Sequence, residues 1–392
     1  SLMIGVDVGG TFTDLVAIET GPEGMKITTA KSDTTPPNFE AGVLNVMAKG
    51  NIDPKDVDFM VHGTTVVINA LTERKGVTVG LITTEGFRDT IEIARGNRPD
   101  FFNLHYEKPE PFVPRYLRAE VPGRMTYLGT ERIPLDLSGV SDIVDHFRTE
   151  GVQAVAISLL HSYANTAHEE AVLAEVQRLW PDVSVVASHQ ITREWREYER
   201  SNTAVLSAYV QPVAARYLGN LDKSLREQGL PQSPYIMQSN CGVDSLEATS
   251  AVPITMVESG PASGFWGAAE LGKLIDEPDI LALDIGGTTA KCSLIEGGEV
   301  RIKRPLIHLR GLLSEGHAEL NEELGSISRR RAEDEHLVQK RPFGIGRRPA
   351  QGGEDPKWGR FHSYHEEVAP SHSIARDGRC RDRRYGGLPG PR

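Results

Sequence analysis

The hydrophobic and polar positions of this chain alternate between short apolar runs and longer amphipathic segments. Apolar runs that end in glycine or polar residues predict buried strands at 77–83, 154–160 and 183–187. Residues 138–150 and 167–180 have the apolar spacing of helices. This order of strands and helices indicates an α/β fold with a parallel or mixed sheet.

The remaining segments give further elements by the same criteria. Helices are predicted at 38–49, at one or two places within 193–221 and at 265–274, and a strand is predicted at 235–239. Turns are predicted at residues 22–28 and at Pro36–Pro37. The density of proline between residues 99 and 122 predicts an extended, loop-rich segment there.

One pattern occurs twice, at residues 4–19 (IGVDVGGTFTDLVAIE) and at residues 281–296 (LALDIGGTTAKCSLIE). In each copy an apolar run ends in Asp, a Gly pair supplies backbone freedom, and β-branched residues favour a return strand, so each predicts a hairpin. The two copies share Asp7/Asp284, Gly9/Gly286, Gly10/Gly287, Thr11/Thr288, Ile18/Ile295 and Glu19/Glu296.

Such a hairpin has the groups that a phosphate site needs. Glycines let backbone N–H groups approach an anion, Thr hydroxyls add donors, and an Asp at the end of the first strand can hold a hydrated divalent cation. An ordinary Gly-rich turn is the simpler interpretation of one copy alone. The presence of two matching copies favours phosphate binding.

A second strand-to-turn transition lies at residues 57–65. The apolar run 57–61 leads into His62-Gly63-Thr64-Thr65, where a helix is expected to begin because Thr hydroxyls can cap helices. N–H groups and hydroxyls at such a place face the cleft outside the carboxyl end of a strand. The simpler alternative is that Thr64 only caps the helix and His62 is a surface side chain.

The two hairpins resemble the paired phosphate loops of the actin, sugar kinase and Hsp70 ATPase superfamily, in which two ribonuclease-H-like domains clamp a nucleotide. The two motifs DVGGTFTD and DIGGTTAK together resemble those of the hydantoinase A and 5-oxoprolinase family, which has relatives such as N-methylhydantoinase A and the acetone carboxylase beta subunit. The same resemblance extends to HGTT at 62–65, REYER at 196–200, MQSNCG at 237–242 and ESGPASG at 258–264. It implies actin-like ATPase (ribonuclease-H-like) domains with a family-specific α/β insertion.

The resemblance also implies roles for the residues of these motifs. Asp7 and Asp284 are expected to hold Mg²⁺ through water and Asp14 to position the attacking group, although a turn-stabilising carboxylate is an equal alternative for Asp14. Contacts to ATP are expected from the small and polar residues of the hairpins, HGTT and ESGPASG, which are Gly9, Gly10, Thr11, Thr13, Gly286, Gly287, Thr288, Thr289, His62, Thr64, Thr65 and Gly260.

Substrate contacts are expected from Arg95, Arg98 and Glu258. Arg88, Arg95 and Arg98 lie close together in the sequence, guanidinium forks suit carboxylates and phosphates, and the family has a similar stretch. A solvated, charge-rich loop is the alternative. The charged residues from 194 to 200 likewise fit either a solvated helix face or a family-specific contact.

Cys241 stands where the family commonly has Gly. A packing role or an altered turn is one interpretation, and a nucleophilic thiol is the other, although no paired base is identifiable in the sequence.

The function implied is an ATP-dependent hydrolase that opens a cyclic amide of the hydantoin or 5-oxoproline type through a phosphorylated carbonyl intermediate. Alternatives are a subunit of an ATP-dependent ketone carboxylase, a small-molecule kinase and a non-catalytic nucleotide-binding scaffold. The resemblance further implies a second hydantoinase/oxoprolinase subunit of the B type as partner, and an oligomer.

Composition narrows the classes of function. A net charge of −11 over 392 residues argues against a nucleic-acid surface for the protein as a whole. The three cysteines are far apart without CxxC spacing, which predicts neither a disulfide framework nor a zinc site and fits a cytoplasmic location. No apolar run has transmembrane length, so no membrane association is expected.

The chain changes character after about residue 306. Of the 86 residues from 307 to 392, 14 are Arg and 15 are Leu, Ile, Val or Phe, too few apolar side chains for a packed core. An irregular basic tail, an RNA-binding extension and translation out of the ancestral frame are the alternatives, and the last is favoured because the family motifs end abruptly. If the last holds, the enzyme is truncated or inactive.

The sequence therefore predicts four segments. They are a first ribonuclease-H-like subdomain at 1–75, an α/β and loop-rich insertion at 76–200, a helical connection with the start of a second such subdomain at 201–306, and the tail at 307–392.

Overall fold

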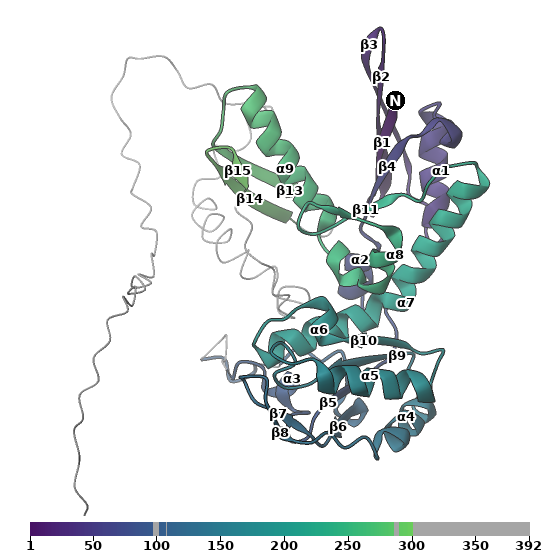
Figure 1. Ribbon diagram of the computed structural model, residues 1–392. Coiled ribbons are helices and arrows are strands. Elements are labelled where there is room, and N and C mark those ends of the chain that lie inside the picture. The colour runs from purple at the N-terminus through teal and green to yellow at the C-terminus, as the bar shows by residue number, and fades with distance from the viewer. Residues whose placement is uncertain (97–101, 107, 286–289, 301–392) are drawn as a thin grey trace, which may run out of the picture. The chain divides into compact units, whose positions relative to one another are not determined.

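The structure, a computed structural model, describes residues 1–96, 102–106, 108–285 and 290–300. Three sheets and one two-stranded hairpin are present in these ranges (Figure 1). The predicted tail at 307–392 lies outside the described residues. Within them, no helix combines the length and the apolarity needed to cross a bilayer.

The first sheet is built around β1 (Leu2–Val8), in which buried and exposed side chains alternate. Ile4, Val6 and Val8 are buried, and helix α1 (Phe39–Lys49) contacts this strand with Val43 and Met47 buried in the same core. A period of two places every second side chain on one face of a sheet, which is why this short apolar run forms a strand.

The strand order of the first sheet is β12-β11-β4-β1-β2-β3. Strands β1, β2 and β3 are antiparallel neighbours, whereas β4 and β11 run parallel to β1. This order confirms the ribonuclease-H-like expectation. The bounds are β2 Phe12–Gly21, β3 Gly24–Asp33, β4 Phe59–Thr64, β11 Tyr235–Met237 and β12 Val243–Asp244.

The second sheet is entirely parallel, in the order β10-β9-β5-β6. Every residue of β5 (Val79–Thr84) and β9 (Ala154–Ser158) is buried, as expected for parallel strands covered on both faces. A Cβ at Gly80 would lie 2.5 Å from the Phe147 ring, so Gly80 permits helix α4 to pack closely. The other bounds are β6 Arg118–Val121, β10 Ser184–Ala187, α4 Val140–Thr149 and α5 Ala167–Leu179.

Helix α7 (Glu197–Glu227) is one continuous helix of 31 residues with Pro212 inside it. It contacts β9 and β10 of the second sheet and also α1, α2 (Val66–Thr72) and η3 (Pro253–Met256). Residues 199–210 are all buried, which is typical of a helix surrounded by protein. The sequence left open whether one or two helices form here, and the structure shows one.

The second predicted hairpin is present as two strands. Antiparallel β13 (Ile280–Ile285) and β14 (Ala290–Glu296) pair with Asp284 opposite Lys291, and β15 (Glu299–Val300) extends this sheet. Helix α9 (Ser259–Leu274) contacts β13 and β14. Residues 286–289, which include the four predicted phosphate contacts of this copy, lie outside the described residues.

The connecting elements are short. They are η1 Pro54–Asp56, α3 Thr90–Ile93, η2 Arg115–Leu117, β7 Arg124–Met125, β8 Glu131–Ile133, α6 Ser188–Ile191 and α8 Leu246–Ala251.

Two predictions of local structure were wrong. Residues 25–28, predicted as part of a turn, belong to β3, most of whose side chains are exposed, so the strand lacks the apolar pattern that would identify it. Helix α9 begins at Ser259 and not at the predicted residue 265. The prediction missed the first turns because they consist of small residues without the apolar spacing of a helix. The four-segment division remains a proposal, and β11 and β12 complete the first sheet from residues 235–244.

Candidate functional site

Three segments of the chain meet at the carboxylate of Asp7. Asp7 lies near the carboxyl end of β1, with Gly63 of β4 and Asp14 of β2 as its neighbours across the sheet. A Cβ at Gly63 would lie 2.6 Å from Oδ1 of Asp7. A Cβ at Gly260, in the first turn of α9, would lie 3.9 Å and 4.0 Å from the two carboxylate oxygens. Both glycines therefore leave room around this carboxylate.

The surroundings of Asp7 disfavour its charged form. Its side chain is reached by solvent, yet protein surrounds it closely enough that desolvation is the main cause of a raised pKa. The negative charges of Asp14 and Asp284 raise the pKa of Asp7 further. A cation at this place would relieve the repulsion, so the electrostatics suit a divalent metal ion. Asp284 belongs to the second hairpin, so its charge acts on a carboxylate of the first.

The turn of the first hairpin is held open by backbone contacts and by Thr34, just after β3. The N–H of Gly9 donates to Phe12 O at 2.9 Å, and Thr34 Oγ1 donates to Gly9 O at 2.9 Å. A Cβ at Gly10 would meet nothing within 4 Å. Within the described ranges, the N–H groups of Gly10 and Thr11 form no hydrogen bond. These two donors are available to an anion.

Thr13 and Asp14 both contact side chains of the first sheet or of the residue just after β3. Thr13 is fully buried, with its hydroxyl 3.2 Å from that of Thr34. Asp14 forms an ion pair with Lys31 at 2.7 Å, and both side chains are about half-exposed. This ion pair fits the alternative of a turn-stabilising carboxylate, and a catalytic role of Asp14 stays a prediction.

The residue just after β4 forms hydrogen bonds with the end of β1. The N–H and the hydroxyl of Thr65 both donate to Val8 O, at 3.0 Å and 3.1 Å. Thr64 is buried, and its hydroxyl accepts a bond from Val66 N at 3.2 Å at the start of α2. The predicted helix start is therefore confirmed, and the Thr pair lies beside the Gly9 turn.

His62 is fully buried, which excludes the alternative of a surface side chain. Its Nε2 lies 2.6 Å from the hydroxyl of Tyr217 on α7. Burial lowers the pKa of His62 from 6.5 to about 4, so the imidazole is neutral at pH 7. The side chain has no exposed surface in this structure, so it lies behind the site and does not display the direct nucleotide contact that the resemblance implied.

His62→Gln should flatten the pH dependence of stability. His62 takes up a proton below pH 6.5 in the unfolded chain but only near pH 4 in the folded chain. The contribution of neutral, buried His62 to the free energy of unfolding is therefore fully present above pH 6.5 and is lost as the pH falls toward 4. This loss amounts to roughly 2 kcal/mol between pH 7 and pH 5. Urea unfolding of both proteins at several pH values measures it. His146→Gln, at an exposed position, is the control and should keep the wild-type slope.

Glu258 precedes α9 in a left-handed conformation, with φ of 65°. This residue orients the first turn of the helix, in which Ser259 is buried and Gly260 approaches Asp7. The amino end of a helix carries a partial positive charge, which suits both Asp7 and a bound anion. The predicted substrate contact of Glu258 stays a prediction.

Two of the three arginines considered for substrate contacts, Arg88 and Arg95, have partners in the protein. Arg95 Nε forms an ion pair with the fully buried carboxylate of Glu199 on α7. Arg88 lies 3.9 Å from Glu120. Arg98 lies outside the described residues. Because Glu199 and Arg200 are buried, a solvated helix face is wrong for this part of α7.

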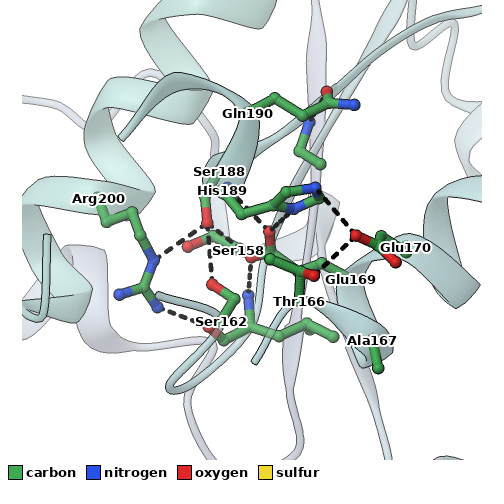
Figure 2. Close-up of polar contacts among 12 residues, drawn as sticks. Ser158, Ser162, Thr166, Ala167, Glu169, Glu170, Ser188, His189, Gln190 and Arg200 are labelled. Atoms are coloured by element: carbon green, nitrogen blue, oxygen red, sulfur yellow. Dashed lines mark hydrogen bonds and ion pairs between the residues drawn. The ribbon is translucent and has the colours of Figure 1, made fainter. Parts of the chain in front are cut away.

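Sequence reasoning missed a buried polar network at the carboxyl ends of β9 and β10. Figure 2 shows Ser188 between Arg200 and Glu169, with dashed lines to both. Glu169 accepts bonds from Leu159 N at 2.8 Å, Ser188 Oγ at 2.6 Å and His189 Nδ1 at 2.7 Å. Burial raises the pKa of Glu169, but these hydrogen bonds outweigh it and lower the pKa overall. The network joins α5, α6 and α7. Its residues are far apart in the sequence and form no recognisable motif, so the sequence alone does not indicate that they meet.

Cys241 has φ of 66°, a left-handed conformation that glycine adopts more easily and that explains why glycine suits this position. Burial raises the pKa of its thiol. An activated nucleophile needs a lowered pKa, so the structure favours the packing interpretation.

Comparison with known proteins identifies proteins that are similar to this chain in sequence and in structure. Residues 3–179 match the hydantoinase/oxoprolinase N-terminal region, and residues 200–315 match the hydantoinase/oxoprolinase domain. The alpha subunit of caprolactamase from Pseudomonas jessenii is 33% identical over 321 residues, covering 78% of this chain and 45% of that protein.

Two solved structures are similar to this fold. The nucleotide-free structure of acetone carboxylase has a TM-score of 0.69 at 28% identity, covering 79% of this chain and 46% of that one. The ATP-dependent caprolactamase of Pseudomonas jessenii has a TM-score of 0.64 at 32% identity, covering 74% and 43%. The chain thus spans less than half the length of these relatives.

Proposed function

The chain belongs to the hydantoinase/oxoprolinase family, and we propose that it is the nucleotide-binding part of an ATP-dependent enzyme that opens a cyclic amide. The observation that carries this proposal is the convergence of β1, β4 and the amino end of α9 on the carboxylate of Asp7. The similarity to an ATP-dependent caprolactamase supports the substrate class, because caprolactam is a cyclic amide.

The residues around Asp7 fit Mg²⁺ and a polyphosphate. A carboxylate with a raised pKa gains from a cation, and Mg²⁺ typically binds one or two carboxylates together with water and substrate phosphates. The N–H groups of Gly10 and Thr11 point to no protein acceptor within the described part of the chain. Gly63 and Gly260 leave the space beside the carboxylate that side chains would fill.

ATP, when bound, supplies the phosphoryl group that activates an amide oxygen, and Mg²⁺ supplies charge neutralisation. In our proposal, Asp7 holds the hydrated cation while Gly10 and Thr11 donate backbone hydrogen bonds to phosphate oxygens. The positive end of α9 faces the same charge. These groups bind and orient, which is most of what phosphoryl transfer requires of a protein.

A ketone carboxylase subunit is the second candidate, because the TM-score is higher for acetone carboxylase, at 0.69, than for caprolactamase, at 0.64. The sequence identities favour caprolactamase, at 32% against 28%. We propose that ring opening needs a second hydantoinase/oxoprolinase subunit, because the chain is similar to one subunit of caprolactamase.

ATP hydrolysis by the full chain, with and without such a second subunit, tests the proposal. We expect stimulation by caprolactam, 5-oxoproline or a hydantoin. Stimulation only by a ketone with bicarbonate would support the carboxylase instead, and phosphorylation of an added alcohol would support a kinase. Calorimetric titration with Mg²⁺–ATP is the prior measurement, and failure of the chain to bind Mg²⁺–ATP would contradict every one of these enzymes.

Gly63→Ala should weaken binding of Mg²⁺–ATP by about tenfold, because the new Cβ would displace the Asp7 carboxylate it approaches to 2.6 Å. Titration calorimetry measures the affinity. Gly5→Ala is the matched control on β1, since a Cβ there meets nothing within 4 Å. Equal affinities of the Gly63→Ala chain and the wild type would show that Asp7 does not need its present position.

A further inference from the structure

A buried pair of polar side chains lies directly behind the Asp7 site. His62 Nε2 and the Tyr217 hydroxyl are 2.6 Å apart, and both residues are almost completely enclosed by protein. His62 belongs to β4, whereas Tyr217 comes from α7, 155 positions later in the chain. Nothing in the proposed chemistry at Asp7 uses this pair.

The hydrogen bond of this pair has a defined direction. Burial, together with the nearby charges of Glu40 and Asp7, raises the pKa of Tyr217, so its hydroxyl keeps the proton at pH 7. Because His62 is neutral at pH 7, its Nε2 can accept the Tyr217 hydroxyl hydrogen. In this bond the Tyr217 hydroxyl is the donor and His62 Nε2 is the acceptor.

The position of the pair connects it to the phosphate site. Across the sheet, His62 lies beside Val6, Gly63 beside Asp7 and Thr64 beside Val8. Two residues after His62, the Thr64 hydroxyl accepts Val66 N at the start of α2. The bond between Tyr217 and His62 therefore restrains the end of β4 at the place where it passes Asp7.

We propose that Tyr217 is a positioning residue for the nucleotide site: its hydroxyl, bonded to His62, fixes the end of β4 and with it Gly63 and the turn into α2 beside Asp7. This inference rests on the proposed function for its ligand, Mg²⁺–ATP. It assigns to α7 a part in shaping the site around Asp7.

Tyr217→Phe removes the hydroxyl and keeps the ring, which packs edge-on against Phe39 with centroids 5.9 Å apart. We expect about tenfold weaker binding of Mg²⁺–ATP by the full chain, since the loss of the buried hydrogen bond to His62 frees the end of β4 beside Asp7. Tyr209→Phe is the matched control on the same helix, where the Tyr209 ring packs on Phe112 with centroids 4.8 Å apart, and it should bind like the wild type.

A double-mutant cycle separates positioning from a general loss of stability. His62→Leu removes the side chain through which Tyr217 acts, so His62→Leu/Tyr217→Phe should bind no more weakly than His62→Leu alone. Losses in affinity that add up fully in the double variant would overturn the proposal.

Hydrogen exchange tests the positioning role without a ligand. In Tyr217→Phe, amides of residues 61–68 should exchange about fivefold faster while those of β5 (Val79–Thr84) are unchanged. Unchanged exchange at 61–68, or equal acceleration in β5, would overturn the proposal. If the wild type binds no Mg²⁺–ATP, the proposed function fails, and the exchange result still decides the role of Tyr217.

Discussion

Asp7→Asn is expected to weaken binding of Mg²⁺–ATP by on the order of 100-fold, or to slow ATP-dependent turnover as much, comparable to the loss of one electrostatic stabiliser. The amide keeps the shape of the carboxylate but cannot neutralise a cation. Calorimetric titration of the full chain measures the change. Asp56→Asn, an exposed position on η1, removes the same charge elsewhere and should bind normally.

The pH dependence of the wild type gives an independent check. Because the pKa of Asp7 is raised, protons compete with the cation at a higher pH than for an ordinary aspartate, so affinity should fall on mild acidification. The Asn variant should lack this step. An Asn variant that binds with wild-type affinity would remove Asp7 from the site.

Arg200→Met is expected to lower the free energy of unfolding by about 3–5 kcal/mol, because it breaks a buried charged network from one side. Arg200 donates to Ser188 Oγ at 3.0 Å, Glu194 O at 2.9 Å and Leu159 O at 2.5 Å. Methionine fills a similar length and leaves these acceptors without that donor. It also removes the positive charge of Arg200 that interacts with the buried carboxylate of Glu169.

Urea unfolding measures this effect. Arg226→Met, at an exposed position near the end of the same helix, should cost less than 1 kcal/mol, as surface ion pairs do. Arg200→Lys keeps the charge but not the three-way geometry and should fall between the two. A loss below 1 kcal/mol for Arg200→Met would mean that the network is dispensable for stability.

The sequence predicted those parts of the fold that a local pattern encodes. The alternating run before Asp7, the paired hairpins and the continuous apolar runs of β5 and β9 all form as expected. Strand β3 escaped prediction because most of its side chains face solvent, so pairing with β2 alone makes it a strand.

The candidate site was predictable only as far as its motifs. Asp7 and the Gly9 turn follow from the repeat, whereas Thr34 and Tyr217 reach the site by tertiary contacts that no spacing reveals. The same holds for Glu199, whose charge fitted either a solvated face or a family-specific contact and whose side chain is buried against Arg95. Charged residues have the same spacing on a solvated helix face and on a buried one, and only the packing of the folded chain distinguishes the two.

The pairing of β11 with β4 sets an order for folding during synthesis. β4 ends at Thr64 and β11 begins at Tyr235, so this edge of β4 waits for about 170 further residues, roughly 10–30 s of translation. All strands of the second sheet emerge from the ribosome in that interval and can fold first. Until then β4 presents an unpaired edge, at which the nascent first sheet can pair with strands of other chains.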